Sequence, residues 1–204
     1  MSNKLDPRYQ KTHKELRESL MELCKEKPYD KITINEITDR AQINRSTFYL
    51  HYPDILALAN DCLMVGVTLR EEYPSKNEII FDPENLIKRT TRFLRFCCDH
   101  SSFILTITNE FLVNPYLKDF YEANLQVQYC FQKALFSGDL TKFSPDDRIA
   151  RFIIAGQARL LGDWLDKNTF DSLEHLAIYH NVLQIKANCG LLGATTPDWV
   201  KPFN

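Results

Sequence analysis

The feature that most constrains this fold is a pair of short helical segments joined by a tight turn near the start of the chain. The first begins at Thr33, whose hydroxyl can cap the Glu36 amide while the Glu36 carboxylate returns to the Thr33 backbone. Its apolar pattern runs to Ala41, and the second segment covers about 45–51 before Pro53 interrupts it. Neither is long enough to be stable alone, so each must pack on a neighbouring helix. Such a pair forms a helix-turn-helix unit.

The rest of the chain is also patterned as helix. Only six glycines occur in 204 residues, and apolar side chains recur at helical spacing. Asp6 is expected to cap a first helix that ends at "KPYDK", because Pro28 cannot continue it. We expect later helices from Asp54 onward, at 84–99, at about 102–112, at 116–136, at 145–167 and at 172–192. The expected caps are Ser101 or Ser102 for the helix at 102–112, Ser144 for that at 145–167, and Asp171 or Ser172 for that at 172–192. A loop is expected at 73–83, and the tail after Leu192 is expected to be irregular.

The sequence therefore predicts an all-α protein of about nine helices with two domains. A three-helix domain that contains the helix-turn-helix covers 8–65, and a larger helical domain covers 66–204. The first 60 residues hold ten Lys/Arg against nine Asp/Glu, so nucleic-acid binding must depend on local placement of charge. Because no apolar run reaches 18 residues, we expect no membrane span and a soluble, cytoplasmic protein.

Six scattered cysteines lack the C-x-x-C spacing of a zinc site, so we interpret them as small buried hydrophobic residues in a reducing compartment. The neighbouring Cys97 and Cys98 leave open the alternative of a redox or soft-metal sensor. His175 and His180 are five residues apart, which does not fit a pair of metal ligands on one helical face. We predict no metal site and no cofactor.

The third helix separates its large side chains onto two faces. At 100° per residue, Phe48 and Tyr52 share a face that can pack, with Ile43, against the preceding helices. The opposite arc has hydroxyls, an imidazole and a leucine, without a carboxylate. Such a helix suits the major groove of DNA, since hydroxyls bond base edges or phosphates, leucine contacts a thymine methyl and arginine pairs with guanine or phosphate. The predicted contacts are Arg45, Ser46, Thr47, Tyr49, Leu50 and His51.

At these residues the chain resembles the tetracycline-repressor (TetR/AcrR) family of bacterial transcriptional regulators. The matching string is "YDKITINEITDRAQINRSTFYLHYPDILAL", from Tyr29 to Leu58. The family pattern has a Thr-capped second helix, an alanine before the turn, and a recognition helix of the form Thr-aromatic-Tyr-x-His/Tyr-aromatic; these fall at Thr33, Ala41 and 47–52. The resemblance is strong over about residues 8–65, and the remainder matches only in helix count and lengths.

The resemblance implies a sequence-specific DNA-binding regulator, expected to be a ligand-responsive repressor that binds a palindromic operator as a homodimer. It adds Thr33 to the DNA contacts given above. Two residues depart from the family pattern. Gln42 stands where the turn usually has glycine, and Ile55 where many members have a lysine that contacts phosphate. Losing that contact is expected to weaken binding and reduce its salt dependence by about one charge unit, unless Lys31 or lysines of the first helix compensate.

The last two helices, 145–167 and 172–192, are predicted to form a four-helix interface between two copies. Within "FIIAGQARLLGDWL", at 152–165, glycines and alanines lie among large apolar side chains. A glycine inside a helix costs about 1 kcal/mol relative to alanine, so two of them indicate close approach of another helix. The alternative is that these helices close the core of a single copy.

The helices between 84 and 136 are rich in aromatic residues, which belong to a core more often than to a ligand pocket. By the resemblance, an apolar cavity with a few polar groups is expected in this region. Candidate pocket residues for a small apolar effector are Phe93, Phe103, Asn109, Tyr121, Gln128 and Gln157.

A second hypothesis is an all-helical small-molecule-binding protein or enzyme that does not bind DNA and uses its N-terminal helices only as support. The sequence has no phosphate-binding loop, no G-x-S-x-G motif and no defensible pair of catalytic carboxylates. We therefore predict that the protein is not an enzyme. The outer arc of residues 45–51 discriminates between the two hypotheses.

Overall fold

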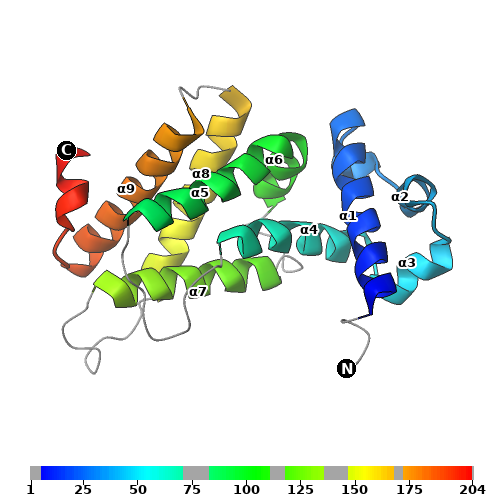
Figure 1. Cartoon of the computed structure of the whole chain (residues 1–204), viewed down its shortest axis with the longest axis horizontal. Coiled ribbons are helices and arrows are strands. Elements are labelled where there is room, and N and C mark those ends of the chain that lie inside the picture. Colours follow the sequence, from blue (N-terminus) through cyan, green and yellow to red (C-terminus); the bar gives the residue numbers. More distant parts are fainter. Residues whose placement is uncertain (1–5, 71–82, 111–117, 136–146, 168–171, 204) are drawn as a thin grey trace. The chain divides into compact units, whose positions relative to one another are not determined.

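The computed structural model describes residues 6–70, 83–110, 118–135, 147–167 and 172–203, and Figure 1 shows these ranges as helices. They contain no strand, so the all-α prediction is confirmed. None of the helices within them is long and apolar enough to cross a membrane. The elements are α1 (Pro7–Glu26), η2 (Tyr29–Lys31), α2 (Ile34–Ala41), α3 (Arg45–His51), α4 (Ile55–Arg70), α5 (Pro83–Asp99), α6 (Ser101–Glu110), α7 (Lys118–Leu135), α8 (Asp147–Lys167), α9 (Leu173–Leu192) and η4 (Asp198–Phe203), where η marks a 3-10 helix.

The chain divides into two compact units. The first comprises Met1–Val65 with His100–Phe120, and the second comprises Gly66–Asp99 with Tyr121–Asn204. The division between residues 65 and 66 lies within α4, and α6 belongs with the first unit. The domain limits expected from the sequence, 8–65 and 66–204, remain a prediction about how the chain is organised.

Three predicted helix caps are confirmed. Asp6 accepts a hydrogen bond from the Arg8 amide at 2.8 Å, with Pro7 in the first helical position of α1. Thr33 and Glu36 form the predicted capping box at the start of α2. Ser172 caps α9 by accepting from the His175 amide at 3.1 Å. Each cap involves residues within three positions of one another, which is why the sequence alone predicts them.

Two other predictions are wrong. Helix α6 begins at Ser101, so Ser101 and Ser102 lie inside the helix and the carbonyl of His100 accepts from the Ile104 amide at 3.0 Å. The tail is not irregular throughout, because η4 forms in it and buries Val200. The predicted loop at 73–83 falls almost wholly outside the described residues, and the predicted cap at Ser144 falls outside them entirely.

In the first unit, α2, α3 and α4 pack around the apolar face of α1. Leu16 and Leu20 of α1 are completely buried, as are Ile37 of α2, Phe48 of α3 and Leu58 of α4. Each such side chain contributes about 1.5–3 kcal/mol through burial. Figure 1 shows α2 and α3 beside α1. This shared core fixes two helices that are too short to be stable alone.

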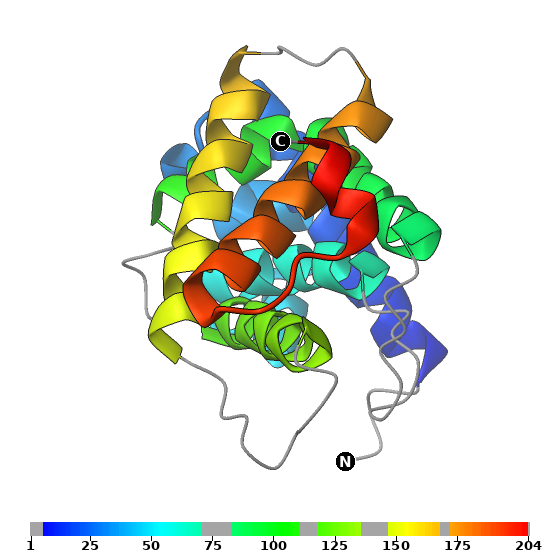
Figure 2. The same cartoon turned by 90° about the vertical axis from the view of Figure 1, so that its left-hand side faces the viewer.

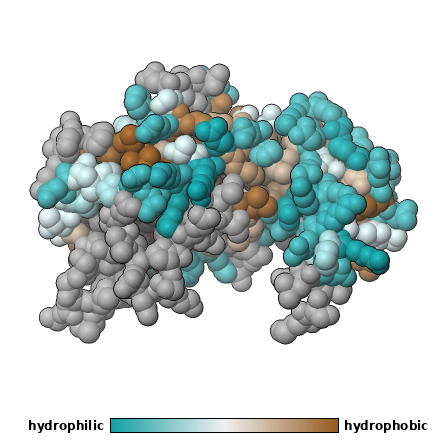
Figure 3. Space-filling model, viewed as in Figure 1, coloured by the Kyte–Doolittle hydropathy of each residue, from teal (hydrophilic) through white to brown (hydrophobic). Residues whose placement is uncertain are grey.

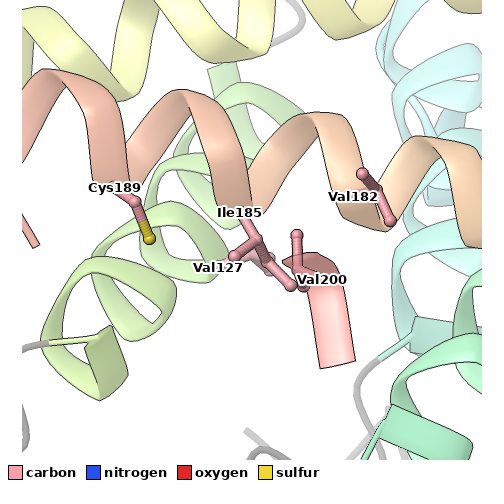
Figure 4. Close-up of a cluster of buried hydrophobic side chains, with 5 residues drawn as sticks. All are labelled: Val127, Val182, Ile185, Cys189 and Val200. Carbon is pink, nitrogen blue, oxygen red and sulfur yellow. The ribbon is translucent and has the colours of Figure 1, made fainter. Parts of the chain in front are cut away.

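In the second unit, α9 packs against α5 and α8. Figure 2 shows α8 and α9 side by side, with the C-terminal segment returning along α9. Figure 4 shows where this segment is anchored: Ile185 of α9 points towards Val127 of α7 and Val200 of η4. Burial of Val200 in this cluster explains why the tail departs from the irregular structure expected of it.

Candidate nucleic-acid interface

The turn between α2 and α3 depends on one unusual backbone conformation. Gln42 is left-handed, with φ 56° and ψ 40°, at the position where the sequence raised the question of a missing glycine. The Ile43 amide donates to the Thr38 carbonyl at 3.0 Å, and the Gln42 amide donates to the Asp39 carbonyl at 3.2 Å. These two bonds form the Schellman motif that closes a helix and reverses the chain. The turn therefore forms without glycine, at a steric cost to Gln42.

The start of α2 is held by charge as well as by the capping box. Hydrogen bonds from Lys27 and then from Thr33 lower the pKa of Glu36 to about 2. The Glu36 carboxylate therefore stays ionised at the positive end of the α2 dipole, where a negative charge is favourable. Thr33 itself is exposed at this end of the helix, which leaves it accessible to a partner.

The inner face of α3 is as predicted. Phe48 is completely buried and Tyr52, just after the helix, is nearly so. Their rings lie 5.9 Å apart between centroids, within the range of favourable aromatic contacts. They anchor α3 to the core and fix which side chains face outward.

The outer face of α3 presents apolar and cationic groups to solvent. Leu50 is 82% exposed and Tyr49 is 47% exposed. Arg45 donates to Asn35 Oδ1 at 3.0 Å and to the Tyr49 hydroxyl at 3.1 Å, with its guanidinium 5.7 Å from the Tyr49 ring centroid. Both hydrogen-bond acceptors are neutral, and within the described ranges no carboxylate forms an ion pair with Arg45. Ser46 is exposed and Thr47 is half-buried on the same helix.

His51 is placed differently from the predicted outward position. Its ring lies 4.6 Å from the Tyr9 ring and 4.9 Å from the His13 ring, measured between centroids. The Nδ1 atom of His51 is buried and has no hydrogen-bond partner. Burial, and secondarily the neighbouring His13, lowers the pKa of His51. A helical wheel drawn for α3 alone could not show this, because Tyr9 and His13 belong to α1.

A part-buried polar network lies behind α3 and joins it to α1 and α4. Arg17 of α1 donates to Asp61 Oδ2 of α4 at 2.8 Å, and the Tyr52 hydroxyl donates to the same oxygen. The Tyr52 hydroxyl also lies 2.5 Å from His13 Nδ1. Burial acts to raise the pKa of Asp61, but the hydrogen bonds from Tyr52 and Arg17 outweigh it and hold that pKa below its usual value. The carboxylate is therefore ionised and ties three helices together.

Sequence reasoning missed Tyr9, His13, Asn35 and Asp61 as residues that support the interface. One of them left a signal. Asp61 is the only charged residue in the apolar run 55–69, and an ionised group there requires a partner. At the start of α4, Asp54 accepts from the Ala57 amide at 2.8 Å, so this amide is not available to a phosphate. Ile55, where a lysine was expected, is half-buried.

The comparisons with known proteins agree with this geometry. Residues 16–62 match the family model described as bacterial regulatory proteins, tetR family. Residues 16–62 therefore form a DNA-binding region of the tetR-family type. The match covers the part of the first unit from the middle of α1 into α4, which holds the whole helix-turn-helix. This match supports a DNA-binding transcriptional regulator rather than an all-helical carrier without DNA binding.

The chain is also similar to two regulators of Bacillus subtilis (strain 168) and to one solved structure. It is 23% identical over 141 residues to the uncharacterized HTH-type transcriptional regulator YdeS, covering 66% of this chain and 70% of that protein. It is 22% identical over 116 residues to the uncharacterized HTH-type transcriptional regulator YxbF, covering 54% of this chain and 30% of that protein. A tetR-family transcriptional regulator from Streptomyces coelicolor shares the fold, with a TM-score of 0.58 and 13% identity over 95% of this chain and 86% of the other.

The predicted effector residues are distributed over both units. Phe93 and Phe103 are buried in different units, and the side chain of Asn109 lies outside the described residues. Tyr121 of α7 is half-buried and accepts a hydrogen bond from Arg151 at 3.1 Å. Gln128 and Gln157 are in contact, with the Gln128 amide donating to Gln157 Oε1 at 3.1 Å. These two are the only members of the set for which the described residues show mutual contact.

The cysteines behave as small hydrophobic groups wherever their side chains are described. Cys24, Cys62, Cys97 and Cys189 are buried and Cys98 is half-buried, all as free thiols. Burial raises the pKa of Cys98 and raises the pKa of Cys24 to about 12. A raised thiol pKa lowers the fraction of reactive thiolate. This favours the packing interpretation of Cys97 and Cys98 over a redox sensor.

Proposed function

We propose that this regulator is a repressor that inserts α3 into the major groove of its operator. The outer face of α3 carries this proposal, because it combines the exposed Leu50 with Arg45, which forms no ion pair with a carboxylate in the part of the chain that the structure describes. A leucine on such a face can contact a thymine methyl, and arginine can pair with guanine or a phosphate. A single exposed leucine is ordinary in proteins. DNA binding is supported because Leu50 occurs together with Arg45 on a helix that has no acidic side chain.

The side chains around α3 take different roles in this proposal. Ser46 and Thr47 reach base edges or phosphates, and Thr33 contacts a phosphate from the start of α2. Tyr49 orients Arg45 through the hydrogen bond between them, and it also donates to the backbone of the DNA. His51 contributes from the side that faces α1, because its ring rests on Tyr9 and His13.

We further propose that the regulator acts as a homodimer through α8 and α9. Both helices expose large apolar side chains, including Phe152 at 69% and Tyr179 at 54%. A Cβ atom added at Gly156 meets no other atom within 4 Å, so this part of α8 leaves room for a second helix to approach. Figure 3 shows hydrophobic residues at the surface of the second unit, whereas the surface over α1 and α2 is mainly hydrophilic. Two copies related by a two-fold axis match a palindromic operator.

An effector bound in the second unit would release such a repressor from DNA. Two recognition helices fit successive major grooves when they are about 34–36 Å apart. A small ligand that binds better to a state with another separation lowers the population able to bind DNA. The ligand needs no contact with the operator, only a difference in affinity between the two states.

Fluorescence anisotropy with DNA from the region flanking the regulator's own coding sequence tests the DNA-binding part. We expect specific binding that weakens as salt rises, because phosphate contacts release counterions. Tyr49→Phe removes the hydroxyl that holds Arg45 and is expected to weaken binding to every sequence alike. Thr47→Ala is expected to change the preference among operator variants. An unchanged preference assigns Thr47 to phosphates, and the absence of any salt-sensitive specific binding would contradict the proposal.

A further inference from the structure

Four neutral amide side chains from three helices gather inside the second unit. They are Gln128 of α7, Gln157 of α8, and Gln184 and Asn188 of α9, and we call them the amide quartet. Gln128, Gln184 and Asn188 are at most 1% exposed. Gln157 is half-buried. The large majority of polar side chains buried to this degree have a hydrogen-bond partner.

Three side chains of the quartet are connected by hydrogen bonds, and Gln184 lies one turn before Asn188 on the same face of α9. The Gln128 amide donates to Gln157 Oε1 at 3.1 Å. The Asn188 amide donates to Gln128 Oε1 at 3.5 Å and to the Gln184 backbone carbonyl at 2.9 Å. Every partner in these bonds is neutral, and the four side chains cannot ionise. The quartet therefore offers hydrogen bonds without offering a charge.

Several atoms of the quartet are buried without a hydrogen-bond partner. They include both polar atoms of Gln184, the Nε2 atom of Gln157 and the Oδ1 atom of Asn188. Leaving a buried amide unpaired is unfavourable, because it has lost its water and gained nothing in return. The unpaired atoms include both donors and acceptors, so a partner that satisfies them must supply both.

Asn181 shows that this deficit is not a general property of α9. It lies on the same helix and is completely buried. Its amide donates to Thr90 Oγ1 at 3.0 Å and to the Ala177 carbonyl at 2.8 Å, and its Oδ1 accepts from the Thr90 hydroxyl at 3.1 Å. Asn181 therefore has hydrogen-bond partners within the protein, whereas the side chain of Gln184, about one turn later on α9, has none.

We propose that the amide quartet binds the effector, and that the effector is a neutral small molecule with an N–H and a C=O side by side on one edge. This inference rests on the ligand response proposed above and names the class of ligand. A primary amide such as that of Gln184 presents a carbonyl beside an N–H, and a cis-amide edge is its complement through two parallel hydrogen bonds. Lactams and cyclic dipeptides have such an edge.

The surroundings of the quartet favour an uncharged ligand with an apolar body. A buried ligand charge would need an opposite charge to offset its desolvation, and the quartet supplies none. Val127, Ile185 and Cys189 are each next in sequence to a quartet residue and belong to a buried hydrophobic cluster. The quartet would satisfy the polar edge of the ligand, and apolar side chains of this kind would cover the rest.

The thermal stability of two variants of the whole chain, each replacing one buried amide of α9, tests whether Gln184 lacks hydrogen-bond partners. Gln184→Met keeps the shape of the side chain and removes the unpaired amide, so without ligand it is expected to raise Tm by about 2–4 °C for each kcal/mol gained. Asn181→Leu removes satisfied hydrogen bonds and is expected to lower Tm. If Gln184→Met instead lowers Tm as Asn181→Leu does, ordered water alone satisfies Gln184 and the proposal is overturned.

Isothermal titration calorimetry without DNA tests the ligand class. The probe is the cyclic dipeptide cyclo(Gly-Phe), and the linear dipeptide Gly-Phe is its zwitterionic control. We expect wild type and Asn181→Leu to bind the cyclic form at least tenfold more tightly than the linear one, and Gln184→Met to lose at least tenfold in affinity for it. No binding of the cyclic form, equal binding of both forms, or binding unaffected by Gln184→Met overturns the proposal.

The same proteins separate a failure of this inference from a failure of the repressor proposal. If ligand-free wild type does not bind DNA but binds the cyclic probe through Gln184, the repressor proposal fails and the ligand site stands. If wild type binds DNA but Gln184 has no effect on the probe, the ligand site fails and the repressor proposal stands.

Discussion

Gln42 is a single residue in a backbone conformation that L-amino acids rarely adopt, and the helix-turn-helix depends on it. Its φ of 56° brings the side chain close to the following carbonyl. Gln42→Gly relieves this contact, although glycine also gains entropy in the unfolded chain. We expect the free energy of unfolding to rise by about 0.5–1 kcal/mol, measured by urea unfolding followed by circular dichroism.

Asn44→Gly provides the matched control for Gln42→Gly. Asn44 lies two residues further along the same turn, with φ −75° and no side-chain capping bond. Glycine relieves no strain there, so only its entropic cost remains and stability is expected to stay level or fall. If Gln42→Gly and Asn44→Gly change the free energy of unfolding equally, the left-handed backbone of Gln42 is not strained.

The sequence predicted the residues that depend on local interactions and missed those that depend on distant ones. The caps at Asp6, Thr33 and Ser172 were predictable because each cap and its partner are neighbours in sequence. The prediction that His51 points outward came from α3 in isolation. Its contact with Tyr9 spans 42 positions of the chain, and no periodicity within α3 carries that information.

At the scale of elements, α3 is held by two different kinds of contact. Phe48 anchors it through apolar burial, and the network of His13, Tyr52 and Asp61 holds it through hydrogen bonds. The sequence predicted the apolar anchor from helical periodicity. It did not predict the network, because polar residues on three separate helices meet only once the core has formed.

His51, beside this network, gives α3 a dependence on pH. Burial and the neighbouring His13 place the folded-state pKa of His51 below its usual value of 6.5. Between those two values the unfolded chain binds a proton that the folded chain does not, so stability falls as pH drops below about 6.5. His51→Phe keeps a ring on Tyr9 and removes the titration. We expect its thermal stability to fall less than that of wild type between pH 7.5 and 5.5.

The exposed His175 on α9 supplies the control for this pH dependence. His175→Phe also removes one imidazole but leaves the α1–α3 contact intact, so the pH profile is expected to match that of wild type. The window above pH 5.5 lies well above the range in which Asp61 becomes protonated. If His51→Phe retains the full wild-type slope in this window, burial of His51 does not produce it.

At the scale of the whole molecule, exposed apolar side chains occur in two regions with different expected roles. Leu50 on α3 is 82% exposed, and Phe152 on α8 is 69% exposed. The comparisons establish the fold and a DNA-binding region of the tetR-family type, whereas the dimer and the effector are proposals that rest on the surface and interior of the second unit. The C-terminal helices could be located from sequence periodicity. Their exposed faces could not, since the same periodicity also fits a helix buried within one copy.

A pair of substitutions separates the two regions. Phe152→Glu places a charge on the proposed dimer surface, where burial would leave it unpaired, so it is expected to convert the dimer to a monomer. A monomer makes too few contacts for specific binding, so operator affinity is expected to fall by at least tenfold. Leu50→Glu introduces the same charge on α3. It is expected to keep the dimer and lose DNA binding, because the carboxylate faces phosphates.

Sedimentation equilibrium is expected to show a monomer for Phe152→Glu and a dimer for Leu50→Glu. Fluorescence anisotropy is expected to show that both variants lose operator affinity. The same substitution at two comparably exposed positions controls for the general effect of an added charge. If Phe152→Glu remains dimeric, α8 does not form the interface and its exposed apolar residues need another partner. If it is monomeric yet retains full specific affinity, one helix-turn-helix suffices for recognition, and the two-fold argument from a palindromic operator fails.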